Sequence, residues 1–230
     1  MNTRTSMAAG PQAPEKPDTR DMVVVHRVFR REFRQAADLI LQAPAGDLRR
    51  AARIADHLEL VIGLLHHHHR SEDEYLWPML LERAGVRADL VHRMERQHEQ
   101  MAGHLANVET LLARWRRTGA ASVAGELSST LRQLRNSLVE HLDEEEQQIL
   151  PIAQECMTVA EWEKLGEIAA AKAPARQRFT VFGLLLEETS RAETEKFMMM
   201  LPAVARFAWQ FGARHRYARY IDRVRGDAVL

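Results

Sequence analysis

The chain has 230 residues, of which 46% are hydrophobic, so it is long enough to bury a substantial core. Its 32 basic residues balance 32 acidic residues, and we expect neither nucleic acid nor a membrane as a partner. No apolar run is long enough to cross a bilayer, and the first 20 residues lack the apolar region of a secretory signal. The single cysteine, Cys156, suits a reducing compartment, which favours a cytoplasmic location.

The predicted elements in chain order are a tail followed by long helices. Three prolines predict disorder for residues 1–19. Apolar residues then recur with helical period, which predicts helices from about Asp18–Asp21 to Pro44, over 47–83, over 86–117, and from after Ser122 toward 151. Asp47 is expected to cap the second helix, and Pro78 to kink or end it. These lengths and short loops predict an all-α fold, with an up-down-up-down four-helix bundle over residues 20–156.

Residues 157–230 are predicted to form a helical extension that packs on the bundle. Thr158 and Glu161 have the spacing of a capping box, which starts a short helix ending near Lys172, before Pro174. Pro202 suits the first turn of a last helix, which is basic and aromatic. The run of methionines at 198–200 is interpreted as packing rather than as a soft metal site.

Ionisable side chains interrupt the apolar stripes of the four predicted bundle helices. They stand where leucine is expected, at His26, His68, Glu72, His98, His141 and Glu145. A buried carboxylate costs several kcal/mol unless it is paired or coordinated. No lysine or arginine occupies these stripes, so bound divalent cations are the expected compensation.

The same pattern occurs twice along the chain. His68 and Glu72 form one HxxxE pair, His141 and Glu145 form the other, and a proline follows each histidine by ten residues. A lone histidine precedes each pair by 42 or 43 residues, which indicates two copies of a helical hairpin. Because residues four apart share a helix face, antiparallel packing would bring six ligands to one level. Two carboxylates that bridge favour two metals, about 3.5–4 Å apart.

Other polar residues near these positions are interpreted as lying outside the ligand set. They are expected to be surface groups, or hydrogen-bond partners of the ligands. They are His66, His67, His69, Asp73 and Glu74 around the first pair, and His92 and His104 on the third helix.

These residues resemble the hemerythrin-like family, also called the HHE cation-binding domain, over about residues 20–155. The pattern H…HxxxE…H…HxxxE and the L-W-P and I-L-P segments that follow carry the resemblance. It implies a non-haem di-iron centre, two iron ions with an oxo or hydroxo bridge, inside a four-helix bundle; manganese and zinc stay open. The segments MTVAEWEKLG and RHRYARYIDRVRG resemble longer actinobacterial members.

The chain departs from the oxygen-carrying hemerythrins, which use five histidines, a glutamate and an aspartate. Their third helix carries HxxxH, whereas here Ala102 lies four residues after His98. Four histidines leave more open metal positions, which favours chemistry over reversible oxygen carriage. A further ligand could come from His67, His69, Tyr75 or the C-terminal segment.

The sequence therefore predicts a di-iron protein that binds or reacts with dioxygen, hydrogen peroxide or nitric oxide at a four-histidine, two-glutamate site. Catalase-like, peroxidase-like or oxidase activity stays open, as does a homodimer. One alternative is an iron- or oxygen-responsive sensing module whose basic tail contacts a partner; the other is a di-iron oxygenase of an organic substrate. We expect the basic helix to pack on the bundle through Trp209, Tyr217 and Tyr220 rather than to bind a partner.

Overall fold

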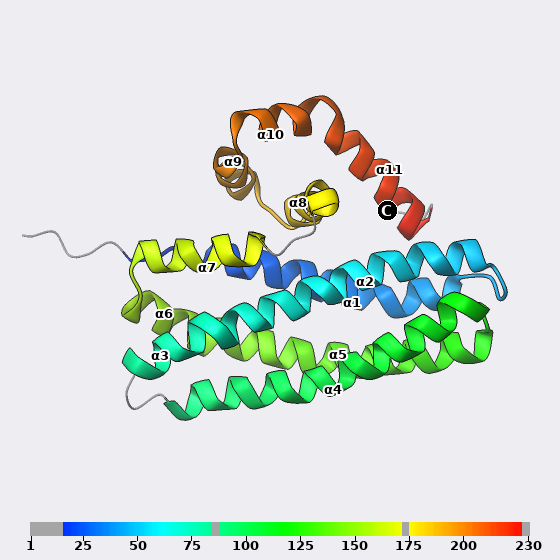
Figure 1. Cartoon of the computed structure of the whole chain (residues 1–230), viewed down its shortest axis with the longest axis horizontal. Coiled ribbons are helices and arrows are strands. Elements are labelled where there is room, and N and C mark those ends of the chain that lie inside the picture. Colours follow the sequence, from blue (N-terminus) through cyan, green and yellow to red (C-terminus); the bar gives the residue numbers. More distant parts are fainter. Residues whose placement is uncertain (1–15, 84–87, 172–174, 227–230) are drawn as a thin grey trace, which may run out of the picture.

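The computed structural model describes residues 16–83, 88–171 and 175–226, and all secondary structure in these ranges is helical. Four long helices lie side by side: α1 (Arg20–Gln42), α2 (Leu48–Ser71), α4 (Ala88–Thr118) and α5 (Ala121–Glu144) (Figure 1). Helix α1 packs against α2 and α5, and α4 packs against the same two helices. The chain thus forms the predicted bundle. None of the helices in the described ranges has an apolar stretch that could span a membrane.

Local signals in the sequence set the ends of these helices. The Asp47 side chain accepts a hydrogen bond from the Arg50 amide at 2.9 Å, which confirms the predicted cap of α2. The loops after α1 and after α4 meet at one end of the bundle, where the Gly46 amide donates to the Gly119 carbonyl at 2.9 Å. Both glycines have positive φ, which suits residues without a side chain. This meeting of loops fixes the antiparallel order of the four helices.

Two helices continue through a widened π-helical turn. Helix α2 runs through η1 (Glu72–Leu76) into α3 (Trp77–Arg83), and α5 runs through η3 (Glu145–Ile149) into α6 (Leu150–Cys156). The amide that follows each turn donates five residues back, to the carbonyl of Glu72 or Glu145. Each turn thereby accommodates the proline that comes next, Pro78 or Pro151, since proline has no N–H to donate.

The second predicted helix reaches Arg83 as expected, and Pro78 does not end it. Other predicted boundaries need correction. The fourth helix continues past residue 151 to Cys156, because proline is tolerated near the start of a helical segment. Helix α5 begins at Ala121, one residue before Ser122. The predicted start of the third helix at residue 86, the end near Lys172, Pro174, and residues 1–15 of the predicted tail lie outside the described residues.

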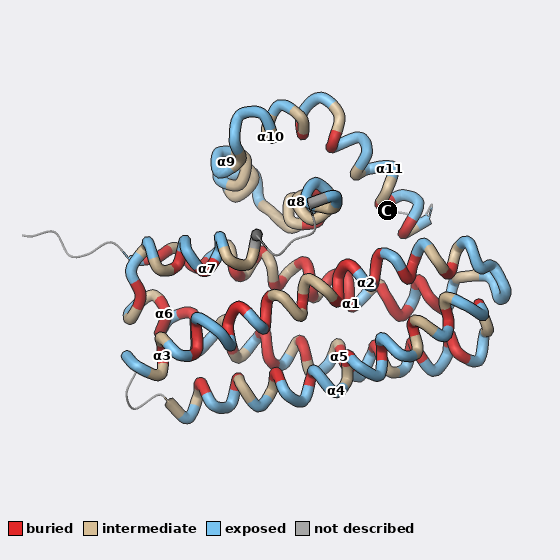
Figure 2. The backbone as a smooth tube through the Cα atoms, viewed as in Figure 1, coloured by how far each residue is buried: buried red, intermediate tan, exposed pale blue. Residues whose placement is uncertain are grey.

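Leucine, isoleucine, valine and phenylalanine side chains fill the centre of the bundle along most of its length. In Figure 2 the buried residues follow the inward sides of the long helices, whereas much of the C-terminal arch is exposed. The fully buried side chains of the bundle include Phe33, Ile40, Leu58, Leu65, Leu105 and Leu127. This apolar surround is what makes the polar residues described below costly to bury.

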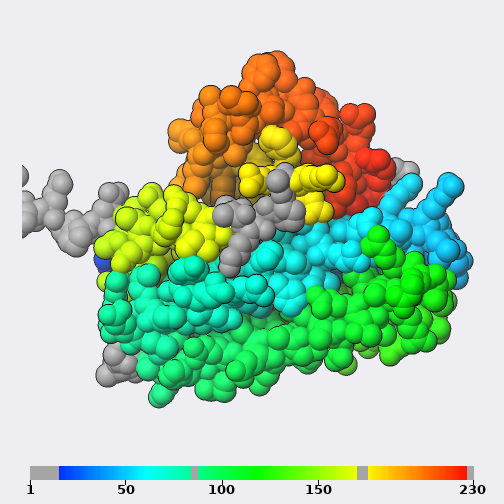
Figure 3. Space-filling model, in the orientation of Figure 1, coloured from blue at the N-terminus to red at the C-terminus, as the bar shows by residue number. Residues whose placement is uncertain are grey.

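The C-terminal residues form one helix along the bundle and an arch above it. Helix α7 (Val159–Ala171) starts at the predicted capping box, in which the Glu161 amide donates to Thr158 Oγ1 and Glu161 Oε2 accepts from the Thr158 amide. The arch contains η4 (Ala175–Gln177), α8 (Arg178–Leu186), α9 (Arg191–Met200), α10 (Ala203–Ala208), η5 (Trp209–Ala213) and α11 (Arg214–Arg225). It stands as a raised mass on one side of the bundle (Figure 3).

The arch rests on the bundle through α8 and α11. Tyr217 and Tyr220 are partly buried and pack in a cluster with Val28 of α1, as expected for anchors. Trp209 is buried, but its ring contacts Phe179, Phe182 and Tyr217 within the arch. The ring of Tyr217 lies so close to Gly183 that a β-carbon there would clash with it. The interpretation of the methionine run as packing is wrong for Met199 and Met200, which are 69% and 67% exposed.

A buried ionic network, which the sequence analysis did not identify, joins the arch to the bundle. Glu32 on α1 lies 2.8 Å from His57 Nε2 on α2 and 2.9 Å from the guanidinium of Arg225 on α11. Arg31 donates to Glu32, to Glu188 and to the Leu184 carbonyl. Burial alone would raise the pKa of Glu32, but His57, Arg31 and Arg225 lower it to about 2.

Candidate metal centre

Seven buried side chains meet at one level of the bundle in two groups. The first group contains His26, His68, Glu72 and Glu145, and the second contains His69, His98 and His141. Within each group the candidate ligand atoms lie within 4.8 Å of one another. The four long helices and the two π-helical turns supply these residues, so the site depends on the assembled bundle.

The two glutamates connect the two groups. Glu72 Oε1 lies 3.1 Å from His68 Nε2, and its other oxygen lies 3.5 Å from His98 Nε2. Glu145 Oε2 lies 3.3 Å from His26 Nε2 and 3.8 Å from His141 Nε2. Each carboxylate therefore faces histidines of both groups, which is the position that a bridge between two cations requires. Each glutamate also opens a π-helical turn, a distortion that often marks functional sites.

Seven of the polar atoms that face the centre have no hydrogen-bond partner. They are Nε2 of His26, His68 and His69, and both carboxylate oxygens of Glu72 and Glu145. Buried polar groups in folded proteins nearly always have a partner, and leaving one unsatisfied costs about 1–3 kcal/mol. Convergent nitrogen and carboxylate donors without partners fit a pair of divalent cations. The residues present therefore suit the metal that the sequence pattern predicts.

The outward-facing nitrogens of three histidines do have partners. His98 Nδ1 donates to Asp73 Oδ1 at 2.7 Å, and His26 Nδ1 donates to Glu146 Oε1 at 2.9 Å. His141 Nδ1 donates to Gln97 Oε1 at 2.8 Å. These bonds place the proton on Nδ1 and leave the Nε2 lone pair directed at the centre, as metal-binding histidines require.

Burial and mutual repulsion determine the charges of the cluster in the absence of a cation. Burial, together with the neighbouring histidines, lowers the pKa of His68, His69 and His141, so these imidazoles are neutral at neutral pH. Burial raises the pKa of Glu72, as do the charges of Glu145 and Asp73, and burial also raises the pKa of Glu145. The carboxylates thus need a positive partner to remain charged.

All six predicted ligand residues lie in the two groups. His69, predicted to lie off the main stripe but left open as a further ligand, belongs to the second group: it is 6% exposed, and its ring stacks on that of His98 with centroids 4.0 Å apart. The cluster therefore has five histidines, not four. A count of four histidines thus no longer speaks against oxygen carriage.

Other polar side chains lie around the cluster. His66 and His92 are partly exposed or exposed and pair with Glu109 and Glu95, as predicted, whereas Tyr75, a possible further ligand, is exposed. Asp73 accepts a hydrogen bond from His98, in agreement with its predicted role as a partner of a ligand. Gln97 and Glu146 have similar roles for His141 and His26 but were not predicted. Gln97 directly precedes His98, and Glu146 directly follows Glu145. These positions beside candidate ligands are the signal that could have identified them.

The matching family model decides the identity of this bundle. The model of the hemerythrin HHE cation-binding domain matches residues 18–153, which is more than half of the chain. The chain belongs to the hemerythrin HHE family. No curated protein and no solved structure matches the chain.

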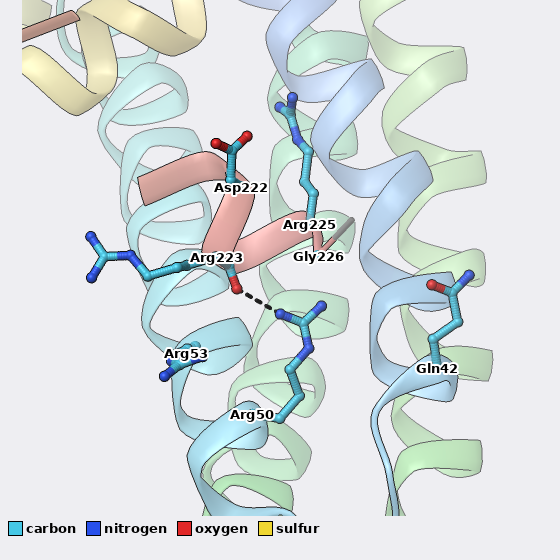
Figure 4. A pocket seen from close by; sticks show the side chains of 7 residues that line it. All are labelled: Gln42, Arg50, Arg53, Asp222, Arg223, Arg225 and Gly226. Atoms are coloured by element: carbon cyan, nitrogen blue, oxygen red, sulfur yellow. Dashed lines mark hydrogen bonds between the residues drawn. The ribbon is translucent and has the colours of Figure 1, made fainter. Parts of the chain in front are cut away.

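Two surface cavities lie away from the centre of this hemerythrin domain. One, of about 490 Å³, lies between the start of α2 and the end of α11, where Arg50 donates to the Arg223 carbonyl at 2.7 Å (Figure 4). The other, of about 630 Å³, lies between α8 and α11 and is lined by residues that include Phe179, Tyr217 and Arg219. Neither cavity shares a lining residue with the histidine and glutamate cluster.

Proposed function

We propose that this protein is a non-haem di-iron protein that binds or reacts with a small oxidant, namely dioxygen, hydrogen peroxide or nitric oxide. The observation that carries the proposal is the set of seven side chains that converge in an apolar core, five of which direct polar atoms without hydrogen-bond partners at the centre. Imidazole nitrogen suits iron, and two carboxylates that face both groups suit a pair of ions.

Each residue of the cluster would have a definite role in holding the two ions. His69, His98 and His141 would hold one ion, His26 and His68 the other, and Glu72 and Glu145 would bridge them. When bound, a pair of redox-active ions supplies electrons to an oxidant and holds it during the reaction. Three histidines face one position and two face the other, so the second position has more room for a small ligand.

The apolar surround supports a small oxidant rather than an organic substrate. Leu65, Phe29 and Leu138 are fully or almost fully buried beside the cluster positions along their helices, and Met101 lies one turn after His98. They keep water away and thereby strengthen the electrostatic interactions of the centre. The two cavities described above do not reach the cluster, so neither would present an organic molecule to it.

The proposal is tested by loading the metal-free full chain with Fe²⁺ under anaerobic conditions. We expect two iron ions per chain, and a visible absorption after addition of dioxygen or peroxide that a reductant bleaches. Glu145→Ala should lose iron and consume peroxide more slowly, whereas His92→Ala, at an exposed position, should behave as wild type. Equal rates of peroxide consumption in wild type and Glu145→Ala would refute activity at this site.

A sensing role is the second candidate, and one observation favours it. Helix α1 carries His26 in the cluster and, about one and a half turns further, Arg31 and Glu32, which hold the C-terminal arch. A change at the centre could therefore alter the arch through one helix. Protease cleavage of the arch that differs between the metal-free and iron-loaded chain would support this role, and identical cleavage would count against it.

A further inference from the structure

The two copies of the hairpin place an acidic residue directly after each glutamate of the cluster, and each acid holds the lone histidine of the other copy. Asp73 follows Glu72 and holds His98; Glu146 follows Glu145 and holds His26. The second partners of the two acids differ. Glu146 accepts a hydrogen bond from Arg30 at 2.6 Å, whereas Asp73 Oδ1 accepts one from the indole N–H of Trp77 at 3.0 Å.

The indole of Trp77 is therefore linked to the centre by a short chain of hydrogen bonds. Trp77 Nε1 and His98 Nδ1 both donate to the same oxygen of Asp73. The Trp77 ring is fully buried, and its centroid lies 5.7 Å from that of His98. It packs in an apolar cluster with Leu76, Leu80 and Met94, which would shield an oxidised ring from solvent.

Tryptophan is among the side chains that lose one electron most readily, and the oxidised ring is a strong N–H acid. A carboxylate that already accepts the N–H bond can take that proton as the electron leaves. We propose that Trp77 is a redox-active residue that supplies one electron to the metal pair through Asp73 and His98. This inference rests on the proposed function, because it requires iron in the centre and a peroxide as the oxidant.

The step balances when the pair holds one Fe²⁺ and one Fe³⁺. Hydrogen peroxide takes up two electrons and two protons, and its O–O bond breaks to give two water molecules. Trp77 would supply one of the two electrons, and oxidation of the Fe²⁺ of the bound pair to Fe³⁺ would provide the other. The indole N–H proton moves to Asp73, the two protons for water formation come from solvent, and Trp77 remains as a neutral radical.

The other tryptophans provide a matched comparison. The indole N–H of Trp162 also donates to a carboxylate, that of Asp21, at 3.0 Å, and Trp162 is only 5% exposed. Asp21, however, bonds to the Met22 amide and has no hydrogen bond to a histidine among the described residues. Trp162 thus has the same local geometry as Trp77 but lacks the connection to the cluster.

The test uses the full chain loaded with iron, reduced by one electron per centre, and mixed with one equivalent of hydrogen peroxide. Samples frozen within milliseconds are examined by electron paramagnetic resonance. We expect an organic radical in wild type whose spectrum narrows when the protein contains ring-deuterated tryptophan. The radical should be lost in Trp77→Phe and retained in Trp162→Phe, with unchanged iron content in both.

The outcomes separate this inference from the function on which it rests. Peroxide consumption without a radical, a radical that ring deuteration does not change, or a radical that persists in Trp77→Phe would overturn the role of Trp77 and leave the proposed function standing. A wild-type centre that does not consume peroxide would overturn both. If Trp77→Phe fails to fold, deuterated wild type shows whether the radical lies on a tryptophan, and Trp115→Phe, Trp162→Phe and Trp209→Phe assign it. Loss of the radical in one of these three variants would overturn the role of Trp77.

Discussion

The Nε2 atoms of His98 and His141 lie 3.1 Å apart, although the two histidines are 43 residues apart in the chain. The Nδ1 proton of His98 is held by Asp73 and that of His141 by Gln97, so both Nε2 lone pairs point at each other. Two facing lone pairs repel unless a proton or a cation lies between them. The same interior contains two carboxylates of raised pKa, so a cation relieves both sources of strain.

Metal binding should therefore stabilise the fold. A ligand at 1,000 times its dissociation constant adds about 4 kcal/mol to the free energy of unfolding if it binds only the folded chain. We expect the thermal midpoint of the full chain to rise on addition of Fe²⁺, Mn²⁺ or Zn²⁺, and to rise much less in Glu72→Ala. His92→Ala should respond as wild type. Equal midpoints with and without metal would contradict a cation site.

The stability of the metal-free chain should depend on pH in a way that the cluster predicts. The buried histidines have lowered pKa values, so the folded chain binds fewer protons than the unfolded chain below the ordinary value of 6.5, and stability rises with pH up to there. The pKa of Glu72 lies well above its ordinary 4.5, so the folded chain retains a proton that the unfolded chain has lost. The contribution of protonated Glu72 to the free energy of unfolding is therefore lost as pH rises from 4.5 toward the raised pKa.

Between pH 4.5 and the raised pKa of Glu72, the Glu72 contribution makes stability fall with pH and so opposes the histidine contribution. Glu72→Gln should remove this fall, since the amide does not titrate, whereas the exposed Glu140→Gln should retain it. Urea unfolding of metal-free protein from pH 4.5 upward measures the effect. A difference in unfolding free energy between wild type and Glu72→Gln that does not change as pH rises would contradict the burial of a protonated Glu72.

The bundle and most of the centre could be predicted because both follow from periodicity. His68 and Glu72 lie four residues apart on an apolar stripe, where a charged residue has no other explanation. His69 could not be recognised on that stripe, because it lies about 100° around the helix from His68. A helix in a four-helix bundle contacts two neighbours, so its buried face is wider than one stripe. Ile62 lies seven residues, or about two turns, before His69 and is therefore on the same face of the helix. It is an apolar residue that is buried, so it could have indicated that the face of His69 is buried too.

The network of Glu32, Arg31 and His57 could not be predicted for a different reason. Its partners come from α11, nearly 200 residues away from Glu32 in the chain, and no local pattern connects Arg225 to α1. The π-helical turns were equally hidden, since the sequence shows only the prolines that follow them. Residues that depend on contacts between distant segments need the folded structure.

The hydrogen bonds behind the ligands should affect metal affinity. Glu146→Gln removes the charged acceptor of His26, and loss of such a partner typically weakens metal binding about 10- to 100-fold. Asp143→Asn is a matched control, because Asp143 pairs with the same Arg30 at 2.6 Å but has an exposed side chain and contacts no ligand. Competition with a chelator measures both affinities. Equal losses in the two variants would show that the effect comes from Arg30 and not from His26.

The ionic network should hold the arch on the bundle. Glu32→Gln would remove the buried carboxylate that Arg31, His57 and Arg225 share, and breaking a buried pair in this way costs about 3–5 kcal/mol. We expect lower stability in urea and faster protease cleavage of residues 175–226, whereas Asp38→Asn, which breaks an exposed pair with Arg132, should change neither.

Acid should weaken the same network in the wild type but not in Glu32→Gln. The pKa of Glu32 is lowered to about 2, so its contribution to stability is complete above its ordinary value of 4.5 and is lost as pH falls toward 2. Protonation of Glu32 removes the negative charge that Arg31, His57 and Arg225 share. The difference in unfolding free energy between wild type and Glu32→Gln should therefore shrink from pH 5 to pH 3, because the wild type loses the charge that the variant already lacks. A difference that stays constant over this range would mean that the Glu32 carboxylate carries no charge in the folded protein.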